Sequence, residues 1–138
     1  MKIALIRPNL GDYRSSDAMP PLAMGILAAR VDGHDVAFYD DKAEPIPATL
    51  DADLVALSVE TFTARRAYQL ADHFRSQGKQ VVMGGYHPTF LPDEALEHAD
   101  AVVTGDAEGI WEQLLSDAAQ GSLGRVYAGN NRAKLTDY

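Results

Sequence analysis

The 138-residue chain contains no cysteine. Within this chain, that absence excludes a disulfide framework, a thiolate zinc site, a cysteine-ligated iron–sulfur cluster and a cysteine nucleophile. The four histidines stand at positions 34, 73, 87 and 98, and no two of them have a spacing typical of metal ligands. We therefore predict no metal site built from the chain's own side chains, and we assign no catalytic residue.

The chain is also short of positive charge. Its 12 Lys and Arg residues stand against 20 Asp and Glu residues, which gives a formal net charge of −8. Because nucleic-acid binding depends on clustered positive charge, we expect no nucleic-acid partner. No apolar run approaches the ~20 residues of a membrane span, and the apolar start runs into Arg7-Pro8 rather than forming a secretory signal. We expect a cytoplasmic domain with no membrane partner.

Apolar sequence is sufficient for one core, since 46% of the residues are hydrophobic in a chain of single-domain length. Five short apolar runs predict strands, and segments of helical period separate them. The predicted strands cover residues 3–6, 34–40, 53–59, 80–83 and 101–103. The third run is continuously apolar, as expected of a strand that helices cover on both faces.

Helical periodicity predicts helices that begin near Pro20, Ala64, Pro92 and Glu108, with a weak helical turn at 48–52. Strands that alternate with helices favour a parallel sheet with right-handed crossovers. We predict an α/β fold, a flavodoxin-like (Rossmann-like) three-layer sandwich with a five-stranded parallel sheet of order 2-1-3-4-5. The domain is expected to cover residues 1–128, and residues 129–138 to form a linker.

In an open parallel sheet, ligands bind outside the carboxyl ends of the strands. The loops expected there lack a dinucleotide-binding Gly-x-Gly-x-x-Gly turn and a P-loop, and they do not fit a flavin-phosphate loop or a phosphoacceptor receiver domain. Three neighbouring strand ends do carry small or polar residues, at Ser58, Gly84-Gly85 and Gly105. Together they predict a floor for a ligand, although Gly-Gly alone is also typical of a tight turn without one.

Four segments carry further motifs: 20–29, 52–58, 84–96 and 100–108. The third contains Gly-Gly-x-His-Pro-Thr followed by a Pro-acidic-acidic-Ala-Leu helix, and the fourth ends in a Gly-acidic-x-Glu loop. In this order, and over most of the chain, these motifs resemble the N-terminal cobalamin-binding domain of cobalamin-dependent radical SAM enzymes. That group contains methyltransferases and the anaerobic magnesium-protoporphyrin IX monomethyl ester cyclase.

The resemblance implies that cobalamin lies across the carboxyl ends of the strands. One loop would lie under the corrin ring, the next would contact the cofactor from one side, the third would line a channel for the nucleotide tail, and the last would close it. In that order, the residues are Asn9 and Leu10; Ser58, Val59, Glu60 and Thr61; Gly84, Gly85, His87 and Thr89; and Gly105 and Glu108.

Two departures from related patterns limit what this chain can do. The first loop lacks the histidine that ligates cobalt from below in methionine synthase and the mutases, so we expect no histidine lower ligand from that loop. The chain also lacks the Cys-x-x-x-Cys-x-x-Cys motif of a radical SAM domain. S-adenosylmethionine and a 4Fe-4S cluster would therefore bind in a C-terminal radical SAM domain of a parent protein, which would carry out methyl transfer or porphyrin ring cyclisation. This chain alone is not expected to be an enzyme.

Two other functions remain open. The chain could be a cofactor-free module of the same fold that only docks a partner domain. Hydrolysis of a small molecule is less well supported, because the sequence offers no nucleophile paired with a base. Glu60 and Glu108 could form a pair of acid–base carboxylates, but helix capping and loop hydrogen bonds are the commoner roles of such residues. His87 could ligate a metal, although a role in shaping the Gly84-Gly85 loop is favoured.

Overall fold

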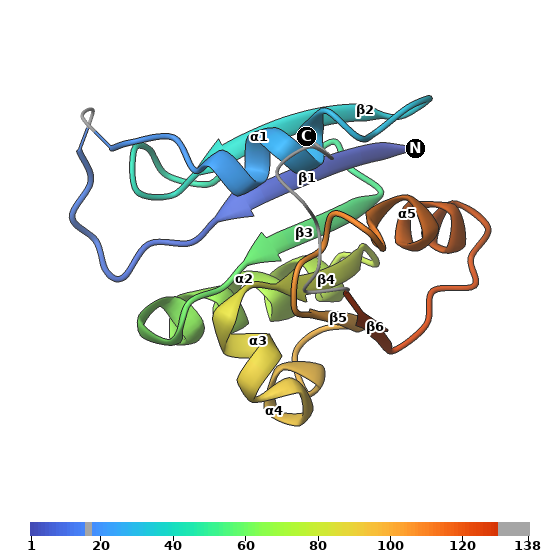
Figure 1. Cartoon of the computed structure of the whole chain (residues 1–138). Coiled ribbons are helices and arrows are strands. Elements are labelled where there is room, and N and C mark those ends of the chain that lie inside the picture. Colours follow the sequence, from blue (N-terminus) through green and yellow to red (C-terminus); the bar gives the residue numbers. More distant parts are fainter. Residues whose placement is uncertain (16–17, 130–138) are drawn as a thin grey trace.

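Six parallel strands form one sheet in the computed structural model, which describes residues 1–15 and 18–129 (Figure 1). The strands are β1 (Lys2–Arg7), β2 (Asp35–Asp40), β3 (Leu54–Ser58), β4 (Gln80–Gly84), β5 (Ala101–Thr104) and β6 (Val126–Ala128). Their order in the sheet is β2-β1-β3-β4-β5-β6. The predicted flavodoxin-like class and the order 2-1-3-4-5 are thus confirmed, and the predicted number of five strands is corrected to six.

The sixth strand forms because the chain returns along β5 after the last helix. β6 pairs with β5 in parallel, with Tyr127 opposite Val103. Backbone bonds on either side of β6 close the pairing, from the amide of Val102 to the oxygen of Arg125 and from the amide of Gly129 to the oxygen of Thr104. Tyr127 is buried against the core, and its hydroxyl donates to Asp117 at 2.7 Å. The predicted linker residues 130–138 lie outside the described residues.

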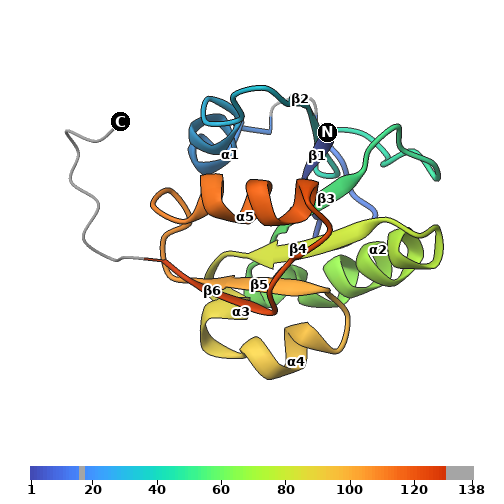
Figure 2. The same ribbon diagram turned by 90° about the vertical axis from the view of Figure 1, so that its right-hand side faces the viewer.

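Helices cover both faces of the sheet (Figure 2). They are α1 (Leu22–Ala28), the short 3-10 helix η1 (Thr61–Thr63), α2 (Ala64–Ser76), α3 (Tyr86–Phe90), α4 (Pro92–Leu96) and α5 (Trp111–Ala119). α1 and α5 lie on one face of the sheet, and α2, α3 and α4 lie on the other (Figure 2). None of the helices in residues 1–15 and 18–129 has the length and hydropathy needed to cross a bilayer.

Three expectations about helices need correction. Residues 86–90 form the helix α3 rather than an open loop, because Pro88 in a first turn costs no hydrogen bond and the amide of Thr89 bonds to the oxygen of Gly85. The last helix begins at Trp111 rather than Glu108, since the amides of Ile110 and Trp111 both bond to the oxygen of Ala107 in a preceding turn. Residues 48–52, expected as a helical turn, contain only bends.

Each sheet face carries its own apolar core, because successive strand residues point to opposite faces. Val55, Leu57 and Val81 pack toward α2. Leu54, Ala56 and Val82 pack toward α1 and α5. In the second core, α1 contributes little apolar packing, because Met24 is its only buried residue.

A buried carboxylate fixes the loop that follows β1. The side chain of Asp41 is fully buried and pairs with Arg14 at 2.8 Å and with Arg66 of α2 at 2.9 Å, while the amide of Asn9 donates to it at 3.0 Å. Burial alone would raise the pKa of Asp41, but the bonds from Arg66, Arg14 and Asn9 outweigh it and hold the pKa below its usual value. The loop is thereby fastened to α2.

Replacing Asp41 by Asn should lower the free energy of unfolding at pH 7 by about 3 kcal/mol, because it leaves two arginines without their counter-charge. The lowered pKa means that the carboxylate contributes stability above its unfolded pKa near 4, and that this contribution disappears as the pH falls through the native pKa. The difference between wild type and D41N should therefore shrink below about pH 4. Urea denaturation at pH 7 and pH 3 measures it.

The matched control is Asp51→Asn, which removes an exposed ion pair with Lys2. Such a surface pair contributes at most about 1 kcal/mol, so this variant should lose little stability. A D41N deficit of the same size at both pH values would contradict the assigned role of Asp41.

Candidate functional site

A cavity of ≈ 580 Å³ opens at the carboxyl ends of β3, β4 and β5. Its inner end is formed by apolar strand residues on the α1–α5 face of the sheet, which are Leu5, Ala56, Val82 and Val103. Residues of α1 and the first residue of α5 form its sides: Ala23, Met24, Leu27 and Trp111. The cavity thus lies between the sheet and two helices and opens at the edge where ligands of parallel sheets bind.

The mouth of this cavity is polar and aromatic. Seven of the twelve residues predicted from the sequence line the cavity: Ser58, Glu60, Gly84, Gly85, Thr89, Gly105 and Glu108. Asp106 adds a third carboxylate beside Glu60 and Glu108. Tyr86 and Phe90, which are 71% and 75% exposed, stand one turn apart on α3 and form an aromatic wall.

The other five predicted residues do not line the cavity: Asn9, Leu10, Val59, Thr61 and His87. Asn9 is buried, and its side chain donates to the oxygen of Tyr13 at 2.6 Å, while Leu10 is largely exposed after β1. Thr61 is exposed in η1. Contact between these residues and a cofactor stays a prediction.

Val59 acts through its backbone, which holds the start of α3 against the end of β3. Its amide bonds to the oxygen of Gly84 at 2.7 Å, and its oxygen accepts from the amide of His87 at 3.1 Å. Gly85, between these two bonds, has φ +106° and ψ −171°, a conformation open essentially to glycine alone. A Cβ at position 85 would lie 2.6 Å from the oxygen of Val59. The glycine here serves a close backbone approach.

Thr89 joins two of the site loops. Its hydroxyl donates to the oxygen of Gly85 at 2.7 Å and accepts from the amide of Gly105 at 3.0 Å. Gly105 has φ +73°, so the chain turns sharply there after β5. One side chain thus fixes the distance between the wall formed by α3 and the loop that carries Asp106 and Glu108.

His87 faces away from the cavity and fastens α3 to α2. Its Nε2 lies 2.9 Å from the hydroxyl of Tyr68 and 3.0 Å from Oε1 of Glu94, and the same Tyr68 hydroxyl donates to Glu94 at 2.7 Å. Since a carboxylate only accepts, this arrangement assigns a proton to Nε2 of His87. Burial, followed by the bond to Glu94, raises the pKa of Tyr68, and the bonds from Tyr68 and His87 lower the pKa of Glu94. The histidine is thus occupied within the fold.

Sequence reasoning missed the helix residues at the cavity, because it considered only the loops that follow strands. Ala23, Met24 and Leu27 of α1 line the cavity, although only Met24 is buried. An available signal was the motif segment 20–29, which contains all three residues. Tyr86 and Phe90 were missed because only a helix over 86–90, which was not predicted, places two residues four positions apart on one side.

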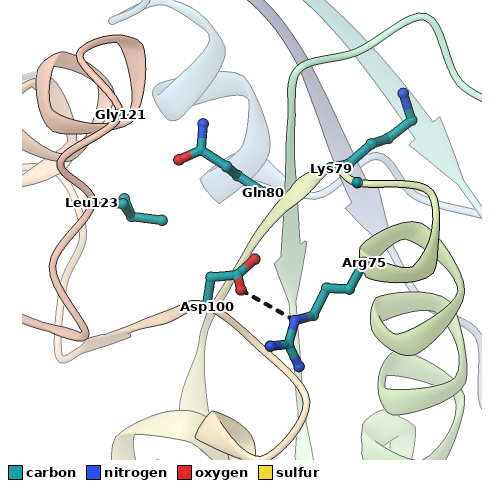
Figure 3. A pocket seen from close by; sticks show the side chains of 7 residues that line it. Arg75, Lys79, Gln80, Asp100, Gly121 and Leu123 are labelled. Carbon is teal, nitrogen blue, oxygen red and sulfur yellow. Dashed lines mark hydrogen bonds and ion pairs between the residues drawn. The ribbon is translucent and has the colours of Figure 1, made fainter.

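A second hollow, of ≈ 470 Å³, lies at the opposite edge of the sheet, at the amino ends of β4 and β5 (Figure 3). There Arg75 pairs with Asp100 at 3.1 Å, and the other oxygen of Asp100 accepts from the amide of Val81 at 2.8 Å. Lys79 donates to the oxygen of Ala52, and Gln80 donates to that of Ala118. These side chains close the edge of the sheet. In the described part of the chain, no group of three or more His, Asp or Glu residues is placed to hold a metal ion.

A protein-family model described as a B12 binding domain matches residues 16–115, most of the segment that builds this cavity. The chain belongs to the B12-binding domain family. Its flavodoxin-like parallel sheet agrees with this membership.

Three curated proteins are similar to this chain in sequence. This B12-binding domain is 38% identical over 104 residues to bacteriochlorophyllide d C-12(1)-methyltransferase of Chlorobaculum tepidum, covering 74% of this chain and 23% of that protein. It is 39% identical over 108 residues to bacteriochlorophyllide d C-8(2)-methyltransferase of the same organism, covering 77% and 24%. An uncharacterized methyltransferase of Pyrococcus horikoshii is 30% identical over 134 residues, covering 83% and 29%.

The B12-binding domain therefore spans about a quarter of the length of these curated relatives. The N-terminal domain of a hypothetical protein of Thermotoga maritima has a similar structure, with a TM-score of 0.56 and 22% sequence identity. The match covers 85% of this chain and 99% of that one, and it supports the fold.

Replacing Gly85 by Ala should lower the free energy of unfolding by roughly 2–4 kcal/mol, because the Cβ meets the oxygen of Val59 in addition to the strained φ. Gly78→Ala is the matched control, since Gly78 also has a positive φ, of +79°, but nothing lies within 4 Å of its Cβ position. This control should lose about 1 kcal/mol. Equal losses in urea denaturation would show that the contact with Val59 is unimportant.

Proposed function

We propose that this domain holds cobalamin with the corrin ring across the ends of β3, β4 and β5 and with the nucleotide tail in the cavity. The cavity itself is the observation that carries the proposal. Its volume of ≈ 580 Å³ falls within the about 300–1,000 Å³ typical of small-molecule sites. Its inner end is apolar and its mouth is polar, which is the order that a flat base followed by a ribose and a phosphate requires.

The residues at the mouth suit the corrin as well. Corrin carries amide side chains, whose N–H groups need acceptors, and Glu60, Asp106 and Glu108 supply carboxylate oxygens there. Tyr86 and Phe90 supply aromatic surface for the apolar edge of the ring. Of the residues predicted from the sequence, those that line the cavity would contact the cofactor, and Val59 and His87 would position α3.

No histidine is proposed as a lower ligand to cobalt. The loop 8–15 contains none. His87, the one histidine on a predicted site loop, lies outside the cavity lining, and its Nε2 is engaged by Tyr68 and Glu94. With a proton on Nε2, this nitrogen has no lone pair to offer a metal. Asn9 and Leu10, in the loop after β1, would lie under the corrin ring.

The domain is proposed to serve a cobalamin-dependent radical SAM enzyme. Three relatives, of which this chain covers about a quarter, are named as methyltransferases, two of them acting on bacteriochlorophyllide d. Bound cobalamin would supply a methyl group carrier, while S-adenosylmethionine and a 4Fe-4S cluster would bind in a separate radical SAM domain. The names of these relatives favour methyl transfer over porphyrin ring cyclisation.

A second candidate is a cofactor-free docking module. Large apolar side chains are exposed around the carboxyl edge, including Leu10, Met19, Leu22, Phe62 and Phe90. Such a surface suits contact with another domain. The same residues are compatible with a cobalamin sandwiched between two domains, so a binding measurement separates the two candidates.

Titration of the purified chain with hydroxocobalamin tests the binding. Trp111, the single tryptophan, lines the cavity, so bound corrin should quench its fluorescence. Ala23→Phe should weaken binding roughly tenfold or more, because Ala23 is an exposed residue that lines the cavity and the added ring would occupy cavity space. Ala29→Phe is the matched control, since Ala29 is exposed at the end of the same helix outside the cavity lining. An unquenched wild type, or equal binding by both variants, would refute the proposed site.

The radical SAM partner has a separate test. We expect the gene that encodes this chain to continue into, or lie beside, a reading frame with Cys-x-x-x-Cys-x-x-Cys. Co-purification of that product with the tagged chain, together with iron and sulfide in a 4:4 ratio of roughly one cluster per complex, is the expected result. Absence of the motif from both the continuation and the neighbouring frames would reject the radical SAM proposal and leave the cobalamin site untouched.

A further inference from the structure

The inner end of the cavity offers no polar side chain to a ligand. Four strand residues form it, namely Leu5, Ala56, Val82 and Val103, and each of them is buried in the apolar core on the α1–α5 face. Met24 and Trp111 close it from the helices. The polar lining residues all lie at the mouth: Ser58, Glu60, Thr89, Asp106 and Glu108.

The polar atoms nearest this inner end already have partners. The indole N–H of Trp111 donates to the oxygen of Leu27 at 3.1 Å. The hydroxyl of Thr89 bonds to Gly85 and Gly105. Among residues 1–15 and 18–129, the buried side-chain atoms without a hydrogen-bond partner belong to Arg14 and His34, and neither lines the cavity. A polar ligand group that enters the inner end would therefore lose its water without gaining a hydrogen bond from a side chain.

We propose that this cavity selects among cobalt corrinoids by the polarity of the base that ends their nucleotide tail, and that it favours a benzimidazole over a purine. The inference rests on the proposed function, since it assumes that the tail enters the cavity. Corrinoids share the ring and differ in this base. A dimethylbenzimidazole presents a hydrocarbon edge, whereas adenine presents an amino group and additional ring nitrogens.

The direction of the preference follows from desolvation. A buried polar group without a hydrogen-bond partner is disfavoured by enough to weaken binding roughly tenfold or more. Adenine would carry an amino group and two additional ring nitrogens into the inner end of the cavity, while benzimidazole would carry only the imidazole-type ring nitrogen that both bases share. The methyl groups of dimethylbenzimidazole would in addition pack against Ala56 and Val82, where they exclude water.

Three probes test the proposal on the purified chain, each titrated against the fluorescence of Trp111. They are cobalamin, the corrinoid with adenine in place of the benzimidazole, and cobinamide, which lacks the nucleotide. We expect cobalamin to bind roughly tenfold or more tightly than the adenine corrinoid, and cobinamide to bind more weakly than cobalamin. Equal binding of cobalamin and the adenine corrinoid would overturn the selectivity while the cobalamin site stands.

The remaining outcomes are equally decisive. If cobinamide binds as tightly as cobalamin, the tail does not occupy the cavity, and the inference fails although corrin binding is retained. If none of the three binds, both the inference and the proposed function fail together. These readouts need no activity of a loaded enzyme.

A pair of neighbouring valines supplies matched variants. Val82→Thr replaces a methyl group by a hydroxyl at the inner end of the cavity, and Val81→Thr makes the same change on the opposite face of β4, in the α2 core. The hydroxyl at position 82 offers adenine a partner, so V82T should reduce the preference for cobalamin by several-fold, whereas V81T should keep the wild-type ratio. Circular dichroism and urea denaturation verify that both variants are folded. The same ratio in V82T and V81T would contradict the assignment of Val82 to the base.

Discussion

The carboxyl edge of the sheet depends on one close backbone contact, between Gly85 and the peptide of Val59. The two bonds made by Val59 draw the start of α3 against the end of β3, and only a residue without a Cβ fits between them. Because α3 carries Tyr86 and Phe90, this contact sets where the aromatic wall of the cavity stands. The same short helix is fastened on its other side, through His87, to Tyr68 of α2. A wall held from both sides keeps its place without help from a ligand.

The loop after β1 is fixed by a different interaction. Asp41 binds Arg14 from that loop and Arg66 from α2, so a fully buried charge joins the two segments. Arg66 lies in the first turn of α2, where a cation opposes the helix dipole. Its pairing with Asp41 offsets that cost. Together, the two anchors place the loop of Asn9 and the wall of α3 before any cofactor arrives, which reduces the ordering that binding would require.

The fold could be predicted further than the site. Continuous apolar runs such as 53–59 identify buried strands, and their alternation with helices leaves few parallel topologies. β6 escaped prediction because three residues give no periodicity, and it depends on pairing with β5. Strand ends identified Ser58, Gly84 and Gly85 as cavity residues. They could not reveal that α3 turns His87 toward α2, since the rotation of a helix depends on tertiary contacts such as those of Glu94.

The small side chains at the inner end of the cavity weigh against a purely docking role. Ala56 and Val82 stand where larger apolar residues would fill the space between the sheet and α1, and filled space is worth dispersion energy and hydrophobic burial. α1 accordingly buries only Met24, so it contributes little apolar packing to the core on its face of the sheet. A domain that only docked a partner through its outer surface would not need this cavity. A ligand that enters the cavity would contribute the missing contacts. Cofactor binding would then stabilise the α1 face of the sheet more than the α2 face.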